Sequence, residues 1–314
     1  MKKYAYLKWA NNIYDVKYKY NWIKKMPLFL RDKYILKNCP LNIEEVSILG
    51  VDGFKVVLPI LLQDIEKKSR KYVQEIIDKT MEILEENSVR IIIPPKEKSN
   101  IYSYSIPIAK GEIIFPLFIY QVILKSLKII NKPLKTVEIA ILDGKNKNTD
   151  LILDIVYPHV NYLSIISDDV ERFKIKAKKI YEDVGLNLQL LSYNNRTALK
   201  NTNVIIDCMD NTHTYFYYAM REVIYFYMGT NKEVVKNILL KRPDIKVIDD
   251  IILSIKNKKI TTDLCEMLWF ISKPWFNRLL SKKYTQEDIK KITKEIKKDG
   301  WEVKSLCQYG NIIH

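Results

Sequence analysis

Hydrophobic positions in the second half of the chain fall into short apolar runs separated by longer amphipathic stretches. We expect these runs to form strands at residues 137–142, 163–167, 188–191, 204–207 and 246–248. Helices are expected between them, most clearly at 169–184 and 231–241. The aromatic stretch from Tyr215 to Tyr227 also reads as a helix, in the core or at a dimer contact. The regular alternation predicts an α/β fold whose Rossmann-like parallel sheet is covered on both faces.

The first third of the chain has a different pattern and predicts a smaller α+β domain. Two short strands are expected between Val46 and Ile60, with a tight hairpin turn at Asp52-Gly53. An amphipathic helix should run from Leu61 to Asn87, and a buried strand from Val89 to Ile93 should follow it.

The remaining segments connect or close these two parts. Residues 115–130 are apolar around most of a helix and predict a buried connecting helix, and two further helices should begin near Thr261 and Thr285. We therefore expect four parts: an N-terminal α+β domain at 1–112, the connecting helix at 113–134, a Rossmann-like domain at 135–260, and C-terminal helices packing back on the domains at 261–314.

The segment from Val137 to Arg172 predicts the first βαβ unit of a dinucleotide-binding fold. In an intact G-x-G-x-x-G turn, glycines make the bend and let the backbone approach the pyrophosphate. Here a single glycine is followed by bulky polar residues: Gly144, Lys145, Asn146, Lys147, Asn148 and Thr149. The first three are the candidate cofactor-binding residues of the turn. Lys145 and Lys147 are also placed to contact phosphate from the side.

Acidic residues follow the predicted strands at positions where a cofactor would be held. Asp168 and Asp169 come after the second strand, and Asp207 ends the fourth. An acid directly after the second strand would bind ribose hydroxyls and repel a 2′-phosphate, so the cofactor expected is NAD or none. The same pair also suits the start of the following helix, its commoner use.

Asn211, Thr212 and His213 follow the strand that ends at Asp207, at an edge where substrate or nicotinamide contacts occur in this fold. His213 is a candidate acid or base. A lone histidine at the start of a helix more commonly has a structural role, and both interpretations stay open.

Composition changes the picture mainly at the N-terminus. The chain has 52 Lys+Arg and 37 Asp+Glu, a net charge of +15, and residues 1–37 contain ten Lys/Arg and two Asp, a net +8. Eight Tyr and Trp residues are interleaved with these charges. Such a segment suits nucleic acid, an anionic membrane surface, or an acidic protein such as a carrier protein, and half-buried elements with solvated lysines are the structural alternative. We place the acidic protein first and nucleic acid last.

Other composition features narrow the protein class. No window approaches the ~20 apolar residues of a membrane span. No apolar stretch follows the charged start, so we expect a cytoplasmic protein. The four cysteines lack a C-x-x-C pair and the three histidines are scattered, so no metal site is expected. A homo-oligomer stays open.

Over its whole length the order of elements resembles the long-chain acyl-(acyl-carrier-protein) reductases, with a more distant likeness to shikimate dehydrogenase and glutamyl-tRNA reductase. The resemblance rests on five features: Leu58-Pro59-Ile60-Leu61-Leu62 before a basic helix, the βαβ unit after Lys135, the 204–207 strand, the helix containing Glu266, and a terminal helix from Thr285 to Gly300-Trp301.

The departures from that family fall on functional positions. The reductases take the acyl group on the cysteine of a Cys-x-x-Glu motif, where this chain has Asp263 and Glu266. An aspartate forms no comparable thioester. Cys265 lies roughly 200° around the helix from Asp263 and is expected to be a buried, inert thiol.

The resemblance and its departures together predict a degenerate, catalytically impaired Rossmann-fold protein with a binding or scaffolding role. The alternative is an active NAD(P)-dependent oxidoreductase acting on an acyl or carbonyl substrate. Its catalytic candidates are Asp263, Glu266 and His213.

Overall fold

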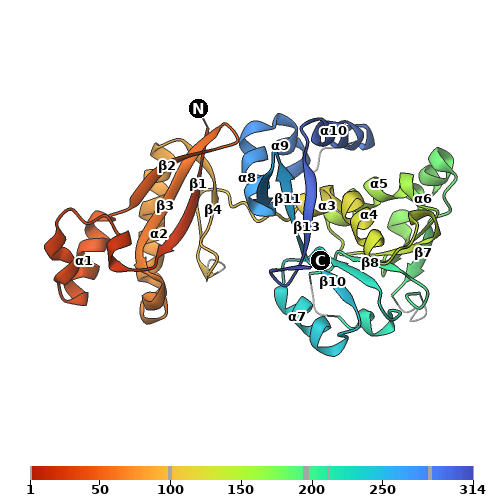
Figure 1. The fold of residues 1–314 in the computed structure, drawn as a ribbon, viewed down its shortest axis with the longest axis horizontal. Coiled ribbons are helices and arrows are strands. Elements are labelled where there is room, and N and C mark those ends of the chain that lie inside the picture. Colours follow the sequence, from red (N-terminus) through yellow and green to blue (C-terminus); the bar gives the residue numbers. More distant parts are fainter. Residues whose placement is uncertain (1, 98–100, 194–197, 211–212, 282–284, 314) are drawn as a thin grey trace. The chain divides into compact units, whose positions relative to one another are not determined.

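A computed structural model of the chain describes residues 2–97, 101–193, 198–210, 213–281 and 285–313. The chain divides into two compact units (Figure 1). Unit 1 comprises Met1–Lys110 and Asp263–Asn277, and unit 2 comprises Gly111–Thr262 and Arg278–His314.

Unit 1 is built on a four-stranded mixed sheet with the order β2-β3-β1-β4. The central β1 (Lys3–Ala10) is parallel to both β3 (Val51–Leu61) and β4 (Val89–Ile93), while β2 (Asn42–Ile48) is antiparallel to β3. The β2–β3 hairpin was predicted, but its turn lies at Leu49 and Gly50, which both have positive φ.

Gly53, predicted to make that turn, lies inside β3 instead. A Cβ atom there would come within 2.5 Å of the ring of Tyr4 on β1. The glycine is therefore required by the packing of a neighbouring strand, which the local sequence does not reveal.

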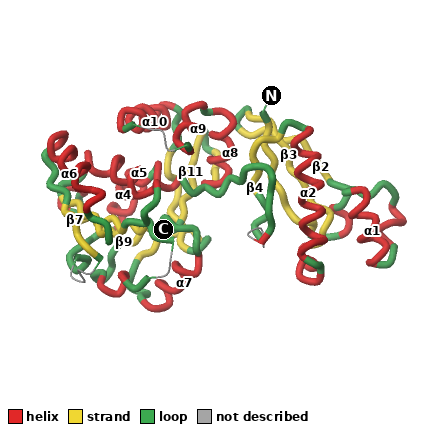
Figure 2. Tube along the Cα trace, turned by 180° about the vertical axis from the view of Figure 1, so that it is seen from behind, coloured by secondary structure: helices red, strands yellow, loops and turns green. Residues whose placement is uncertain are grey.

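Helix α2 (Arg70–Glu86) covers the sheet of unit 1 with its apolar face (Figure 2). It begins after Ser69, whose hydroxyl accepts a hydrogen bond from the amide of Tyr72 at 3.2 Å. The predicted helix from Leu61 thus starts late, because Leu62–Lys67 form a separate 3-10 helix, η3. The unit also contains α1 (Leu28–Asn38) and most of α8 (Thr262–Ser272) and α9 (Pro274–Leu280).

Unit 2 contains a six-stranded, fully parallel sheet with the order β7-β6-β5-β8-β9-β10. Its strands are β5 (Glu138–Leu142), β6 (Tyr162–Ser167), β7 (Gln189–Ser192), β8 (Val204–Asp207), β9 (Ile224–Tyr227) and β10 (Lys246–Ile248). Numbered from β5, this order is 3-2-1-4-5-6, which is the order of dinucleotide-binding Rossmann folds. The predicted α/β fold class and the parallel pairing of β5 with β6 are confirmed.

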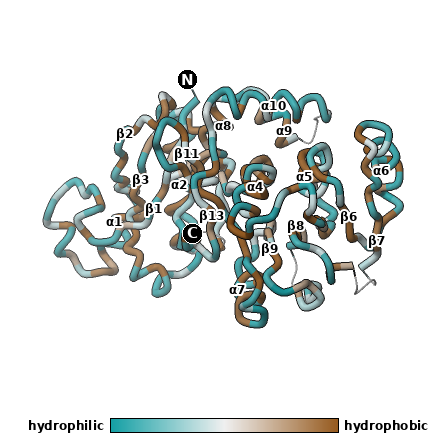
Figure 3. Tube along the Cα trace, turned by 45° about the vertical axis from the view of Figure 1, so that its right-hand side comes forward, coloured by the Kyte–Doolittle hydropathy of each residue, from teal (hydrophilic) through white to brown (hydrophobic). Residues whose placement is uncertain are grey.

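Helices cover both faces of this sheet, as predicted. On one face α7 (Lys232–Lys241) packs against Tyr225, Tyr227 and Val247. On the other, Phe115 of α3 meets Phe226 edge-on, with ring centroids 6.4 Å apart. The hydrophobic character of α4 is visible in Figure 3. The helices of the unit are α3 (Ile114–Leu117), α4 (Ile119–Ile129), α5 (Lys147–Val156), α6 (Glu171–Val184), α7 (Lys232–Lys241) and α10 (Gln286–Lys298).

The helix predicted over the aromatic stretch 215–227 is wrong. Tyr215–Tyr218 form a short 3-10 helix, η7, and the chain turns at Glu222, where φ is +59°, before entering β9. All four residues of β9 are buried between β8 and β10. Aromatic residues suit such a central strand, and its two neighbours decide the outcome over local helical spacing.

Unit 2 also contains an antiparallel sheet with the order β12-β11-β13-β14. Its strands are β11 (Asp250–Ile255), β12 (Lys258–Thr261), β13 (Glu302–Gln308) and β14 (Asn311–Ile313). The β11–β12 hairpin turns at Lys256-Asn257, both with positive φ, and has no counterpart among the predicted elements. Within the described ranges, no helix combines the length and apolar character needed to cross a membrane.

Candidate functional site

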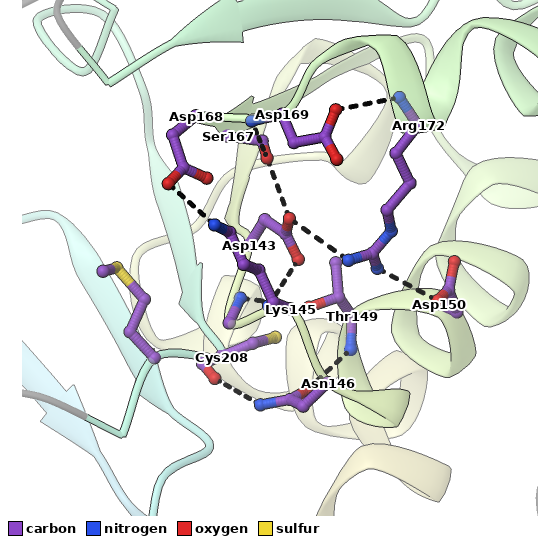
Figure 4. Close-up of polar contacts among 12 residues, drawn as sticks. Asp143, Lys145, Asn146, Thr149, Asp150, Ser167, Asp168, Asp169, Arg172 and Cys208 are labelled. Atoms are coloured by element: carbon purple, nitrogen blue, oxygen red, sulfur yellow. Dashed lines mark hydrogen bonds and ion pairs between the residues drawn. The ribbon is translucent and has the colours of Figure 1, made fainter.

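Polar residues gather at the carboxyl ends of β5, β6 and β8, where the strand order of the sheet reverses (Figure 4). In open α/β sheets this switch point is the place where ligands bind. Asp143 follows β5, Ser167 ends β6 and Asp207 ends β8. The hydrogen bonds at this edge determine which polar groups are left to bind a ligand.

Asp143 is the buried centre of the β5–α5 turn and is not among the predicted site residues. Its carboxylate accepts hydrogen bonds from the Ser167 hydroxyl at 2.8 Å and from the Lys145 amide at 2.8 Å. The Arg172 guanidinium lies 3.5 Å away. These contacts satisfy the carboxylate and tie the turn to β6 and α6. The only sequence signal was an aspartate directly after a buried strand.

Gly144 is required by a close approach of two backbone segments. A Cβ atom at this position would lie 1.8 Å from the carbonyl oxygen of Cys208, just after β8. The one glycine retained in the turn therefore lets the β5–α5 turn pack on the end of β8.

Asn146 occupies the beginning of α5 with its own side chain. Its Oδ1 accepts hydrogen bonds from the amides of Asn148 at 3.0 Å and Thr149 at 3.3 Å. Its Nδ2 donates to the Cys208 carbonyl at 2.7 Å. Amides at a helix start are the groups that would bind a phosphate, and two of them are already satisfied here. A pyrophosphate that bound at this helix start would have to compete with the Asn146 side chain for these two amides.

Lys145 and Asp168, both expected to contact cofactor, form an ion pair with each other. Lys145 has a positive φ of 52°, and its Nζ lies 2.9 Å from Oδ2 of Asp168. Because of this contact the pKa of Asp168 is lowered and that of Lys145 is raised. The carboxylate is therefore ionised and engaged at neutral pH.

Asp169 shows the structural use of the acid pair. Its carboxylate accepts a hydrogen bond from the Arg172 amide at 3.4 Å, and its own amide donates to the Ser167 hydroxyl at 3.0 Å. These bonds place Asp169 at the start of α6. The side chain of Lys147 lies outside the described part of the structure.

Asp207 is fully buried at the end of β8 and accepts three hydrogen bonds. The donors are the Tyr225 hydroxyl at 2.7 Å, His213 Nε2 at 2.8 Å and the Met209 amide at 2.9 Å. His213 Nδ1 accepts from the Tyr215 amide at 3.3 Å, so the proton of the ring lies on Nε2. Both ring nitrogens are engaged, which favours the structural interpretation of His213. Asn211 and Thr212 lie outside the described residues.

Two stacked tyrosines close over this edge and were not predicted. The rings of Tyr193 and Tyr215 lie 4.6 Å apart at 23°. The Tyr193 hydroxyl donates to the Asp143 carbonyl at 2.7 Å, and burial raises the pKa of that hydroxyl. The chain's own aromatic rings thus occupy space beside the β5–α5 turn.

The remaining predicted residues belong to unit 1. Glu266 is buried on α8, where its Oε2 accepts a hydrogen bond from the Lys110 amide at 3.0 Å. Asp263 Oδ1 accepts from the Leu264 amide at 2.7 Å. Cys265 is fully buried, and burial together with the nearby Glu266 raises its thiol pKa well above the usual value. The expected burial of Cys265 is confirmed.

The structure thus brings Gly144, Lys145, Asn146, Asp168, Asp169 and Asp207 with His213 to one edge of unit 2. Asp263 and Glu266 are on unit 1. Among the residues that the structure describes, no group of three or more His, Cys, Asp or Glu is arranged to hold a metal ion.

No protein family model matches the chain, and no curated protein shows a matching sequence. Among solved structures, L-tryptophan dehydrogenase from Nostoc punctiforme matches with 13% identity and a TM-score of 0.36, covering 95% of this chain and 80% of that one. A shikimate dehydrogenase in complex with NADP+ matches with 12% identity and a TM-score of 0.37, covering 94% and 95%.

Aspartate transcarbamoylase from Trypanosoma cruzi, in complex with carbamoyl aspartate and phosphate, matches with 9% identity and a TM-score of 0.35, covering 78% of each chain. Likenesses at this level indicate no activity. The strand order of the sheet itself establishes the Rossmann-like fold of unit 2.

Proposed function

We propose that this chain is a catalytically impaired relative of the acyl-carrier-protein reductases, with a binding or scaffolding role in place of hydride transfer. The observation that carries the proposal is the contact set of Asn146. Its side chain satisfies two amides at the start of α5 and bridges to the Cys208 carbonyl. The place where a pyrophosphate would bind is therefore filled by the protein itself.

A phosphate that bound at the start of α5 would break the hydrogen bonds that the Asn146 side chain makes there. An asparagine cap stabilises a helix start by about 1 kcal/mol. The hydrogen bond to Cys208 adds about 1 kcal/mol. Displacing Asn146 would therefore weaken dinucleotide binding by about 2 kcal/mol, which is roughly thirtyfold in Kd.

Two further observations support the proposal. The Lys145–Asp168 pair engages the acid that would hold the ribose. On unit 1, Asp263 stands at the position that the resemblance assigns to the acyl-accepting cysteine. The ionised Asp168 would also repel a 2′-phosphate, so any residual binding should favour NADH over NADPH.

The test is calorimetric titration of the full chain with NADH and NADPH. We expect weak or undetectable binding, with any preference for NADH. Asn146→Gly frees the two amides and should raise the affinity for NADH by up to about thirtyfold. The matched control is Asn231→Gly, because Asn231 caps α7 in the same way, accepting from the Glu233 amide at 3.1 Å. Micromolar binding by the unmodified chain, weakened by Asn146→Gly, would contradict the proposal.

The second candidate function is an active NAD(P)-dependent oxidoreductase acting on an acyl or carbonyl substrate. It is favoured by the 3-2-1-4-5-6 strand order and by the acid and histidine at the end of β8. In this case either His213 of unit 2 or Asp263 and Glu266 of unit 1 would supply the catalytic groups, and an acidic carrier protein would deliver the acyl chain. NADH oxidation that depends on an acyl-carrier thioester, and is lost in Glu266→Gln, would establish it.

A further inference from the structure

Six large apolar side chains between β1 and β2 are exposed to solvent. They are Tyr14 (78% exposed), Tyr20 (50%), Trp22 (61%), Leu28 (46%), Phe29 (62%) and Leu30 (37%). Single exposed apolar residues are common on proteins, but six of them between residues 14 and 30 are a dense group that points to an interaction site. Together with Lys17, Lys19, Lys24, Lys25 and Lys33, these side chains are named the lysine–aromatic surface.

The backbone under this surface is well anchored. Val16, Ile23 and Ile35 of the same segment are buried, with exposures of 2%, 0% and 4%. Two 3-10 helices, η1 (Ile13–Asp15) and η2 (Asn21–Lys25), lead into α1. The outward apolar side chains are thus presented by a fixed scaffold.

The segment that carries these side chains is strongly basic. The only acids between residues 11 and 38 are Asp15 and Asp32. Asp15 accepts bonds from the amides of Asn11 and Asn12, at 2.8 and 3.2 Å. Asp32 pairs with Lys68 and accepts from the hydroxyl of Tyr72. Both acids are engaged on the scaffold, so the lysines give the surface its sign.

The lysines are also mixed among the rings. Lys24 Nζ lies 4.9 Å from the ring centre of Tyr14, and Lys19 Nζ lies 5.4 Å from that of Tyr20. The Tyr20 ring stacks in turn on Trp22, with centroids 6.3 Å apart. A partner must therefore accept aromatic rings that have lysines directly beside them.

We propose that the lysine–aromatic surface docks on an anionic phospholipid membrane. Trp and Tyr rings settle at headgroup level, Leu and Phe enter the acyl boundary, and lysines pair with anionic headgroups. Nucleic acid would use the rings and lysines but has no place for the consecutive Leu28, Phe29 and Leu30. This inference does not depend on whether a dinucleotide binds at the carboxyl ends of β5, β6 and β8.

The experiment is co-sedimentation of the full chain with vesicles of phosphatidylcholine, with or without phosphatidylglycerol. We expect at least tenfold stronger binding to the anionic vesicles, weakened by salt. Tryptophan emission should shift to the blue on binding. The shift would report on Trp22, since Trp9, Trp269, Trp275 and Trp301 are each at most 9% exposed.

Two variants and a matched control test the surface itself. Trp22→Ala/Phe29→Ala/Leu30→Ala should reduce vesicle binding at least tenfold, and Lys24→Glu/Lys25→Glu should abolish the anionic preference. The control Ile175→Ala/Tyr181→Ala/Leu240→Ala removes side chains that are 74%, 62% and 74% exposed on unit 2 and should bind like the unmodified chain. Circular dichroism checks that each variant is folded.

Several outcomes would overturn the proposal. One is an absence of binding to anionic vesicles by the folded chain. Another is equal loss of binding in the control variant. A third is that the two surface variants leave vesicle binding unchanged but abolish binding to RNA, to an acidic carrier protein or to a second copy of the chain.

Discussion

Replacing Asp207 by asparagine should destabilise unit 2 through the buried cluster at the end of β8. The side chain is fully buried and accepts from the Tyr225 hydroxyl, His213 Nε2 and the Met209 amide. An asparagine has one acceptor oxygen. In either orientation its NH2 group faces a donor, the Met209 amide or the Tyr225 and His213 pair. At least one buried donor therefore loses its partner.

The size of the effect follows from these bonds. A hydrogen bond to a charged group contributes about 1.5–3 kcal/mol, so we expect a loss of about 3 kcal/mol in the free energy of unfolding. In a domain of about 150–250 residues this lowers the Tm by roughly 6–12 °C. Tyr225→Phe removes one donor and should cost less, about 1–2 kcal/mol.

Thermal unfolding followed by circular dichroism measures the shift, and hydrogen exchange of peptides covering residues 204–228 localises it to unit 2. Asp168→Asn is the matched control, because Asp168 also follows a parallel strand but its side chain is 57% exposed. It should leave the Tm unchanged. If Asp207→Asn keeps the Tm of the unmodified chain and instead abolishes an NADH-dependent activity, the cluster is catalytic and this reasoning fails.

Three further predictions concern single positions. Burial raises the pKa of Asp250, so as pH rises above about 4 the unfolded chain loses this proton before the folded chain does. The free energy of unfolding should therefore fall as pH rises through the folded pKa. Asp250→Asn should flatten that part of a Tm-against-pH curve. Cys265 should react slowly with iodoacetamide until the chain is unfolded, as judged by mass spectrometry, and Cys265→Ala should cost ~1 kcal/mol in urea unfolding. Gly144→Ala places a Cβ 1.8 Å from the carbonyl oxygen of Cys208 and should lower the free energy of unfolding by about 1–3 kcal/mol or more. Gly185→Ala is the control, because its Cβ meets nothing within 4 Å. At that left-handed position the loss should be smaller, as thermal unfolding of both variants would show.

The sequence by itself determined the elements whose signal is local. The apolar runs at 137–142, 163–167 and 204–207 became β5, β6 and β8 with ends shifted by at most one residue. Thr285 begins α10, with its hydroxyl accepting from the amide of Asp288, as its position before acidic residues predicted. Such elements are predictable because their burial pattern and caps lie within one stretch of chain.

Tertiary structure decided how those elements are used. The end of the aromatic stretch, Ile224–Tyr227, became a strand because it pairs with β8 on one side and β10 on the other. The position of the Asn146 side chain in the β5–α5 turn depended on a bond to Cys208, which is 62 positions away. The missing glycines showed that the turn was unusual, but not that Asn146 would bond to Cys208 or that Lys145 would pair with Asp168. Contacts between distant residues depend on chain topology, and the local pattern of polar and apolar residues carries no record of them.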